Sequence, residues 1–140
     1  MEYAVIGEHL THSFSKEIHN ELADYSYIVH EVEKERLSDF ICAREYRGLN
    51  VTIPYKKDVI PLLDWIDDTA LNIGAVNTIV NRDGRLKGYN TDFYGLSALI
   101  ERTGVAMAGE KVLILGTGGT SVTANAVAHA MGASSVLRVS

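Results

Sequence analysis

The sequence predicts an α/β fold with a mixed, mainly parallel sheet flanked by helices. Apolar runs typical of buried strands alternate along the chain with segments in which apolar residues recur at helical spacing. This alternation favours parallel strands joined by helices. An Asp83-Gly84 step between two strand-like runs adds one antiparallel hairpin to the pattern.

The first part of the chain supplies strands and helices in turn. The predicted strands are Tyr3–Gly7, Tyr27–Val32, Gly48–Thr52, Ala75–Val80 and Leu86–Tyr89. Helical segments are predicted around residues 18–22, 37–44, 59–63 and 69–73, and a longer helix runs from about Thr91 to Gly104. Residues 1–104 have a normal size for a domain that folds independently.

After a linker at Val105–Gly109, the chain follows the order strand, helix, strand once. Lys111–Leu115 and Ser135–Val139 are the predicted strands, and Thr120–Met131 is the predicted helix. A single βαβ unit is less than half of a dinucleotide-binding domain. We therefore expect residues 105–140 to be the beginning of such a domain, and the chain to be a fragment, either cut deliberately or naturally truncated.

Composition argues against several classes of protein. The 140 residues are 46% hydrophobic and 22% charged, as in an ordinary globular protein. A net charge of −5 without a basic block argues against nucleic acid as a partner. No apolar run suits a membrane span or a signal peptide, so we expect no membrane partner and a reducing, cytoplasmic setting. Cys42 is expected to be a small buried residue on a helix, with a reactive thiol as the alternative.

The segment His12-Ser13-Phe14-Ser15 lies between the first predicted strand and the first predicted helix. Two hydroxyls and the backbone N–H groups at a helix start can bind an anion such as a carboxylate. The alternative is structural, with Ser15 capping the helix and Ser13 closing a local turn.

The segment Asn50–Lys56 ends the third predicted strand. It delivers Asn50 and Thr52 to one face and leaves Lys56 on the turn that follows. Ligands of open α/β sheets bind beyond the carboxyl ends of strands. A lysine there can donate a proton to a developing alkoxide, or accept one if its pKa is lowered. The alternative is an ordinary surface lysine beside Lys57.

Two further segments, Gly74–Thr78 and Gly88–Asp92, place Asn77 and Asp92 on opposite sides of the hairpin region. Asp92 falls in the first turn of a helix, where the N-terminal dipole stabilises a carboxylate, so a structural role is one interpretation. If Asp92 pairs with Lys56, it would orient the ammonium group and tune its acidity.

A glycine-rich loop joins the strand and the helix of the βαβ unit, which is the context expected for a Rossmann-type dinucleotide site. Its candidate cofactor-binding residues are Gly116, Thr117, Gly118, Gly119 and Thr120. Ser121 departs from the G-x-G-x-x-G pattern but is small enough for close packing of helix on strand. Ser140 lies about where an NAD enzyme has an acidic residue, which favours NADP.

In this order, these motifs resemble the shikimate dehydrogenase family over nearly the whole chain. The resemblance implies a substrate-binding catalytic domain followed by a Rossmann-type domain. It also implies an oxidoreductase of aromatic amino-acid (chorismate) biosynthesis that reversibly reduces 3-dehydroshikimate to shikimate with NADP and without a metal. The implied roles are substrate carboxylate binding by Ser13 and Ser15, ring hydroxyl binding by Thr52, Asn77 and Asp92, and catalysis by Lys56 with Asp92.

The chain also departs from the family. Glu8 and Lys16 stand where proline is common, and the remainder of the second domain, which completes the nicotinamide site, is missing. We therefore expect the chain alone to bind substrate weakly and to have little activity.

The alternatives are a quinate/shikimate dehydrogenase and a non-catalytic shikimate-binding module. The sheet edge after Val139 favours pairing with another chain, as in a homodimer.

Overall fold

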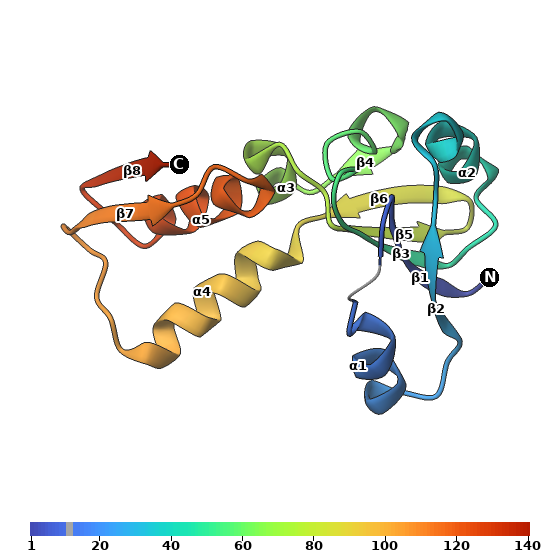
Figure 1. Cartoon of the computed structure of the whole chain (residues 1–140), viewed down its shortest axis with the longest axis horizontal. Coiled ribbons are helices and arrows are strands. Elements are labelled where there is room, and N and C mark those ends of the chain that lie inside the picture. The colour runs from blue at the N-terminus through green and yellow to red at the C-terminus, as the bar shows by residue number, and fades with distance from the viewer. Residues whose placement is uncertain (11–12) are drawn as a thin grey trace. The chain divides into compact units, whose positions relative to one another are not determined.

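The structure is a computed structural model that describes residues 1–10 and 13–140 (Figure 1). His12 of the first motif lies outside the described residues. Contacts divide the chain into two compact units, Met1–Asn90 and Thr91–Ser140. The helix that the sequence places at the end of the first domain lies in the second unit, and the domain limits at residues 104 and 105 stay predictions.

The Met1–Asn90 unit is built on a six-stranded sheet with the order β2-β1-β3-β5-β6-β4. Its strands are β1 (Tyr3–Gly7), β2 (Tyr27–Glu31), β3 (Gly48–Val51), β4 (Trp65–Ile66), β5 (Thr78–Arg82) and β6 (Arg85–Tyr89). Strand β1 is parallel to β2 and β3, and β4 is parallel to β6, whereas β5 is antiparallel to β3 and β6. The predicted mixed sheet is confirmed.

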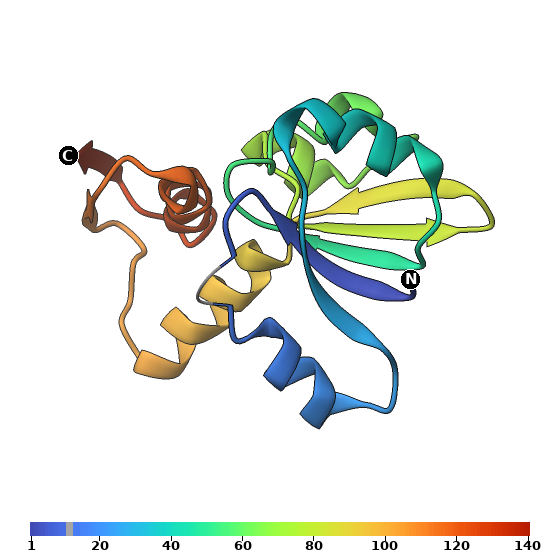
Figure 2. The same cartoon turned by 45° about the vertical axis from the view of Figure 1, so that its right-hand side comes forward.

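Helices lie on both faces of this sheet. They are α1 (Ser15–Leu22), η1 (Lys34–Arg36), α2 (Leu37–Ala43), η2 (Ile60–Leu62) and α3 (Asp68–Ile73). Figures 1 and 2 show α2 and α3 on one side of the sheet and α1 on the other.

The hydrophobic core lies on the α2 side of the sheet. Alternate strand residues such as Ile6, Leu49 and Ile79 point into it and are almost fully buried. The residues between them, including Asn50 and Thr78, therefore belong to the face that α1 covers. That face carries the polar side chains of the candidate site.

Strands β2, β3 and β6 each differ from the predicted bounds by one residue at one end, and three larger details also differ from the prediction. Strand β4 was not predicted, because two residues are too few to show a period. Strand β5 begins at Thr78 rather than at Ala75, since Val76 N–H donates to the Lys56 carbonyl instead of to a neighbouring strand. Cys42 lies on α2 as expected, but its side chain is exposed, because Ile41 is the residue that enters the core.

The Thr91–Ser140 unit contains α4 (Thr91–Thr103), β7 (Lys111–Leu115), α5 (Gly119–Ala130) and β8 (Ser135–Val139). Strands β7 and β8 are parallel, so the predicted βαβ unit is present. Nowhere in residues 1–10 and 13–140 does a helix combine the length and the apolar character that crossing a membrane requires.

Asp64 links α2 to the hairpin of the first unit and makes folding sensitive to acid. Its carboxylate accepts the Leu86 N–H at 2.7 Å and pairs with Arg44 at 3.0 Å. The Leu86 hydrogen bond first, and then Arg44, hold the pKa of Asp64 below its ordinary value of 3.8. A carboxyl pKa lowered by folding stabilises the protein above the unfolded-state pKa, and this contribution is lost as the pH falls through the folded pKa.

Asp64→Asn is therefore expected to lower the free energy of unfolding at neutral pH, with a deficit that shrinks below about pH 4. Urea unfolding at neutral and acid pH measures this deficit. Asp58→Asn, at an exposed position, is the control. A deficit in unfolding free energy that is the same at both pH values would contradict the lowered pKa of Asp64.

Candidate functional site

A pocket of about 480 Å³ lies beyond the carboxyl ends of β1 and β3. Its walls include Ser13, Ser15 and Thr52, three of the predicted substrate residues. Because β1 and β3 are parallel, their carboxyl ends meet at one edge of the sheet. The volume lies within the range of small-molecule sites.

Ser13 and Ser15 lie at the start of α1. The Ser13 hydroxyl accepts the Ser15 N–H at 3.3 Å, so the predicted local turn at Ser13 is present. The alternative in which Ser15 caps the helix is wrong, since the N-cap residue is Phe14 and Ser15 is the first helical residue. Both hydroxyls therefore lie at the positive end of the helix dipole, where an anion is stabilised.

Thr52 and Lys56 follow β3. Thr52 N–H donates to the Ile6 carbonyl at 3.0 Å, which joins the ends of β1 and β3. The Lys56 carbonyl accepts the Val76 N–H at 2.7 Å, and the Asn77 carbonyl accepts the Val51 N–H at 2.8 Å. The structure thus brings the backbone of Lys56 next to the segment that carries Asn77.

A chain of hydrogen bonds leads from Tyr27 through Asn50 and Thr78 to Asn77, one of the predicted substrate residues. Tyr27 hydroxyl donates to Asn50 Oδ1 at 2.7 Å, Asn50 Nδ2 donates to Thr78 Oγ1 at 3.4 Å, and Thr78 Oγ1 donates to Asn77 Oδ1 at 3.0 Å. At the Tyr27 end, the Ser15 side chain lies close enough to the Tyr27 hydroxyl to lower its pKa. Burial, partly offset by the Ser15 side chain, raises the pKa of Tyr27 to about 12, so Tyr27 is a neutral donor at physiological pH.

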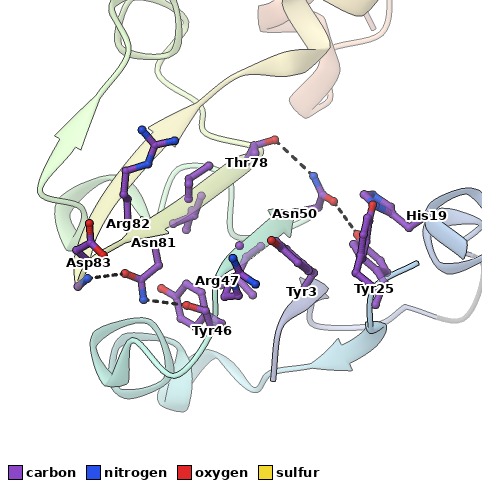
Figure 3. Close-up of a pocket in the computed structure, with 16 residues that line it drawn as sticks. Tyr3, His19, Tyr25, Tyr46, Arg47, Asn50, Thr78, Asn81, Arg82 and Asp83 are labelled. Carbon is purple, nitrogen blue, oxygen red and sulfur yellow. Dashed lines mark hydrogen bonds between the residues drawn. The ribbon is translucent and has the colours of Figure 1, made fainter. Parts of the chain in front are cut away.

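The same face of the sheet carries a larger pocket of about 750 Å³ (Figure 3). Figure 3 shows His19, Tyr25 and Asn50 at one side of it and Asn81, Arg82 and Asp83 at the other. The sequence did not predict this pocket, because its walls come from strands that are neighbours only through the sheet register, such as Asn50 opposite Thr78. Asn50 is paired with Thr78, and Thr78 is hydrogen-bonded to its neighbour Asn77, so the strand register is the feature that connects Asn50 to the predicted residue Asn77.

Asp92 lies in the first turn of α4, as predicted. It follows two residues after Asn90, which is 1% exposed and whose Nδ2 donates to the Ala75 carbonyl at 3.0 Å. Asn90 ends the first compact unit and Asp92 belongs to the second. The pairing of Asp92 with Lys56 stays a prediction.

The glycine-rich loop has a geometry that suits a dinucleotide. Gly116 has φ +114°, which disfavours other residues, and Gly118 caps α5. A Cβ atom at Gly116, Gly118 or Gly119 would meet no described atom within 4 Å, so no side chain of another segment crowds the loop at these three positions. Ser121 is 7% exposed, as the packing position of the motif requires. Within the described part of the chain, no group of three or more His, Cys, Asp or Glu side chains could hold a metal.

Comparison with known proteins decides the family. The model of the shikimate dehydrogenase substrate binding domain matches residues 5–79. The chain belongs to the shikimate dehydrogenase family. The matched residues include the serines of the pocket, Thr52, Lys56 and Asn77.

Relatives of the family extend the match. The chain is 43% identical over 127 residues to the shikimate dehydrogenase (NADP(+)) of Clostridium beijerinckii, which covers 85% of this chain and 47% of that protein. It is 44% identical over 135 residues to the same-named protein of Carboxydothermus hydrogenoformans, and this match covers 91% of this chain and 47% of that protein. The chain thus spans about half the length of the curated relatives it matches.

Solved shikimate dehydrogenases share the fold. The enzyme of Thermus thermophilus in complex with shikimate is 30% identical, with a TM-score of 0.88, over 100% of this chain and 57% of that chain. Shikimate dehydrogenase 1 of Peptoclostridium difficile is 35% identical, with a TM-score of 0.89, over 98% of this chain and 54% of that chain. Full coverage of this chain by the Thermus structure includes Asp92 and the glycine-rich loop.

Gly7 lies where the loops that follow β1 and β3 come into close contact. A Cβ atom there would lie 2.8 Å from Leu10 Cδ2, 2.9 Å from Thr52 Cγ2 and 3.0 Å from the Ile53 carbonyl oxygen. Gly7→Ala is therefore expected to separate the β1 and β3 loops and to weaken binding of a small-molecule ligand in this pocket by about tenfold or more, with shikimate as the trial ligand. Calorimetric titration measures this, with Gly95→Ala, where a Cβ meets nothing within 4 Å, as the control. Equal affinity in Gly7→Ala and the unaltered chain would contradict this role.

Proposed function

We propose that the chain binds shikimate and 3-dehydroshikimate and supplies the substrate site for their NADP-linked interconversion. The pocket that joins Ser13, Ser15 and Thr52 carries this proposal. Support also comes from the family match and from the Thermus relative, which was solved in complex with shikimate.

Each polar group of the substrate has a matching side chain. The carboxylate would accept hydrogen bonds from Ser13 and Ser15 and gain from the dipole of α1. The ring hydroxyls would bind Thr52, Asn77 and Asp92. A ring hydroxyl can donate as well as accept, so it suits either end of the Asn77 amide, whose Oδ1 also accepts from Thr78.

The reaction needs one proton and one hydride. In the reduction, the nicotinamide supplies hydride to the ketone carbon when the cofactor is bound. Lys56 donates a proton to the ketone oxygen as its carbon–oxygen double bond becomes single, and the neutral amine then regains a proton from water. Asp92 orients the ammonium group. In the oxidation, neutral Lys56 removes the hydroxyl proton.

The cofactor would lie at the start of α5. Backbone N–H groups of Thr117, Gly118, Gly119 and Thr120, with Gly116 forming the turn, would approach the pyrophosphate. The first turn of a helix leaves such groups without intrahelical partners. The curated relatives are named for NADP(+), which favours NADP over NAD.

A chimera tests the proposed reaction. This chain is joined at Ser140 to the remaining carboxyl-terminal part of the Clostridium beijerinckii relative, and turnover of shikimate and quinate is measured with NADP and NAD. We expect the highest kcat/KM with shikimate and NADP. Preference for quinate would establish the quinate/shikimate dehydrogenase instead. Shikimate binding without turnover would indicate a non-catalytic module.

The proposal includes a cytoplasmic location and a homodimer. Cell fractionation tests the first, and sedimentation of the 140-residue chain over a range of concentrations tests the second. A single monomeric species at all concentrations would contradict the dimer.

A further inference from the structure

Helix α1 carries Ser15 into the pocket, yet apolar packing does little to fix it. Within the described residues 15–22, the helix buries no side chain. Ile18 is 55% exposed and Leu22 is 69% exposed, although both have the spacing of an apolar helix face. Another contact must therefore hold the helix against the sheet.

His19 makes that contact. Its ring stacks on the ring of Tyr27, with centroids 3.8 Å apart and planes within 8° of parallel. Its Nδ1 forms a hydrogen bond with the Tyr25 hydroxyl, and the two rings meet edge to face at 5.7 Å. Tyr25 in turn packs on Tyr3 of β1, with centroids 5.0 Å apart. Figure 3 shows His19 and Tyr25 together at one side of the large pocket.

The stacked ring belongs to the hydrogen-bonded chain of the site. Tyr27 is 3% exposed, and its hydroxyl lies between Ser15 and Asn50. A ring held in a fixed plane holds its hydroxyl at a fixed point. His19 and Ser15 are four residues apart on α1, so they share one face of the helix. The ring that His19 stacks on is thus the one whose hydroxyl Ser15 approaches from the preceding turn of α1.

We propose that His19 is a positioning residue of the substrate site, which clamps α1 on Tyr27 and so sets the Ser15 hydroxyl for the substrate carboxylate. His19 is not one of the pocket-lining residues around Ser13, Ser15 and Thr52, and it acts through Tyr27 and Ser15. This inference rests on the proposed function, because shikimate supplies the carboxylate.

A double-mutant cycle tests the coupling. Shikimate affinity is measured by calorimetry for the 140-residue chain and for His19→Ala, Ser15→Ala and the double variant. We expect His19→Ala to weaken binding about tenfold alone but less than about twofold in the Ser15→Ala background. His19→Phe, which keeps the stack, should recover part of the loss. Asn20→Ala, exposed on the same helix, should bind as the unaltered chain does. Equal losses in both backgrounds, or no loss, would overturn the proposal.

Hydrogen exchange tests the clamp without any ligand, and so separates its failure from that of the proposed function. In His19→Ala, the Ile18 N–H, which donates to Phe14, and the Ala23 N–H, which donates to residue 19, should exchange faster. The Thr52 N–H, which donates to Ile6, should keep its rate and report an intact sheet. Unchanged exchange in α1 would overturn the clamp even if shikimate binds. If the unaltered chain does not bind shikimate, the proposed function fails and this measurement still decides the role of His19.

Discussion

Replacing Lys56 with alanine is expected to slow hydride transfer by on the order of a hundredfold or more, the loss typical of removing a positioned proton donor. The reason is that Lys56 is proposed to protonate the ketone oxygen as the hydride arrives. The measurement is the single-turnover rate of NADPH oxidation by the chimera with saturating 3-dehydroshikimate. This design removes product release from the observed rate.

Lys57→Ala is the matched control for Lys56, since Lys57 is the exposed neighbour on the same turn. It should keep the rate of the unaltered chimera. Asp92→Asn should lower the rate as well, and by less in the Lys56→Ala background, because the two residues are proposed to act as a pair. An unimpaired rate in Lys56→Ala would refute the catalytic assignment.

Removing both serine hydroxyls of the pocket is expected to weaken shikimate binding on the order of a hundredfold. A hydrogen bond to a charged group contributes about 1.5–3 kcal/mol, and 1.4 kcal/mol is a tenfold change in affinity. Because the two serines receive one carboxylate, the losses need not add in full. Calorimetric titration of shikimate into Ser13→Ala/Ser15→Ala measures the effect.

Two controls make the serine experiment specific. Lys16→Ala changes an exposed residue in the same helical turn and should leave affinity unchanged. The methyl ester of shikimate lacks the negative charge, so the double variant should lose much less affinity for the ester than for shikimate. The same loss for acid and ester would show that the serines do not receive the carboxylate.

Local patterns in the sequence predicted most of the fold. The Asp83-Gly84 hairpin is confirmed, with φ of 55° and 78° at these residues, as a type I′ turn requires. Strand β1 lies where the apolar run that ends at Gly7 predicted it, and helix α4 ends just before Gly104, as predicted. Strand β4 was not predicted, because Trp65 and Ile66 gain their strand geometry only by pairing with β6.

The site was predictable where it depends on strand ends. Ser13, Ser15 and Thr52 meet because two parallel strands end at one edge, a consequence of topology that the sequence pattern already contained. Tyr27 and Asn50 were not predicted as site residues. Their roles depend on the register of non-consecutive strands and on the stacking of an aromatic ring, and no local pattern specifies either.

The most direct test of the account is a titration of the 140-residue, isotope-labelled chain with shikimate, followed by backbone amide chemical shifts. We expect saturable shifts at Ser13, Ser15, Thr52 and Asn77, with one dissociation constant for all four. Saturable shifts confined to the hairpin residues 81–84 of the larger pocket, or no shifts at the four residues, would contradict it.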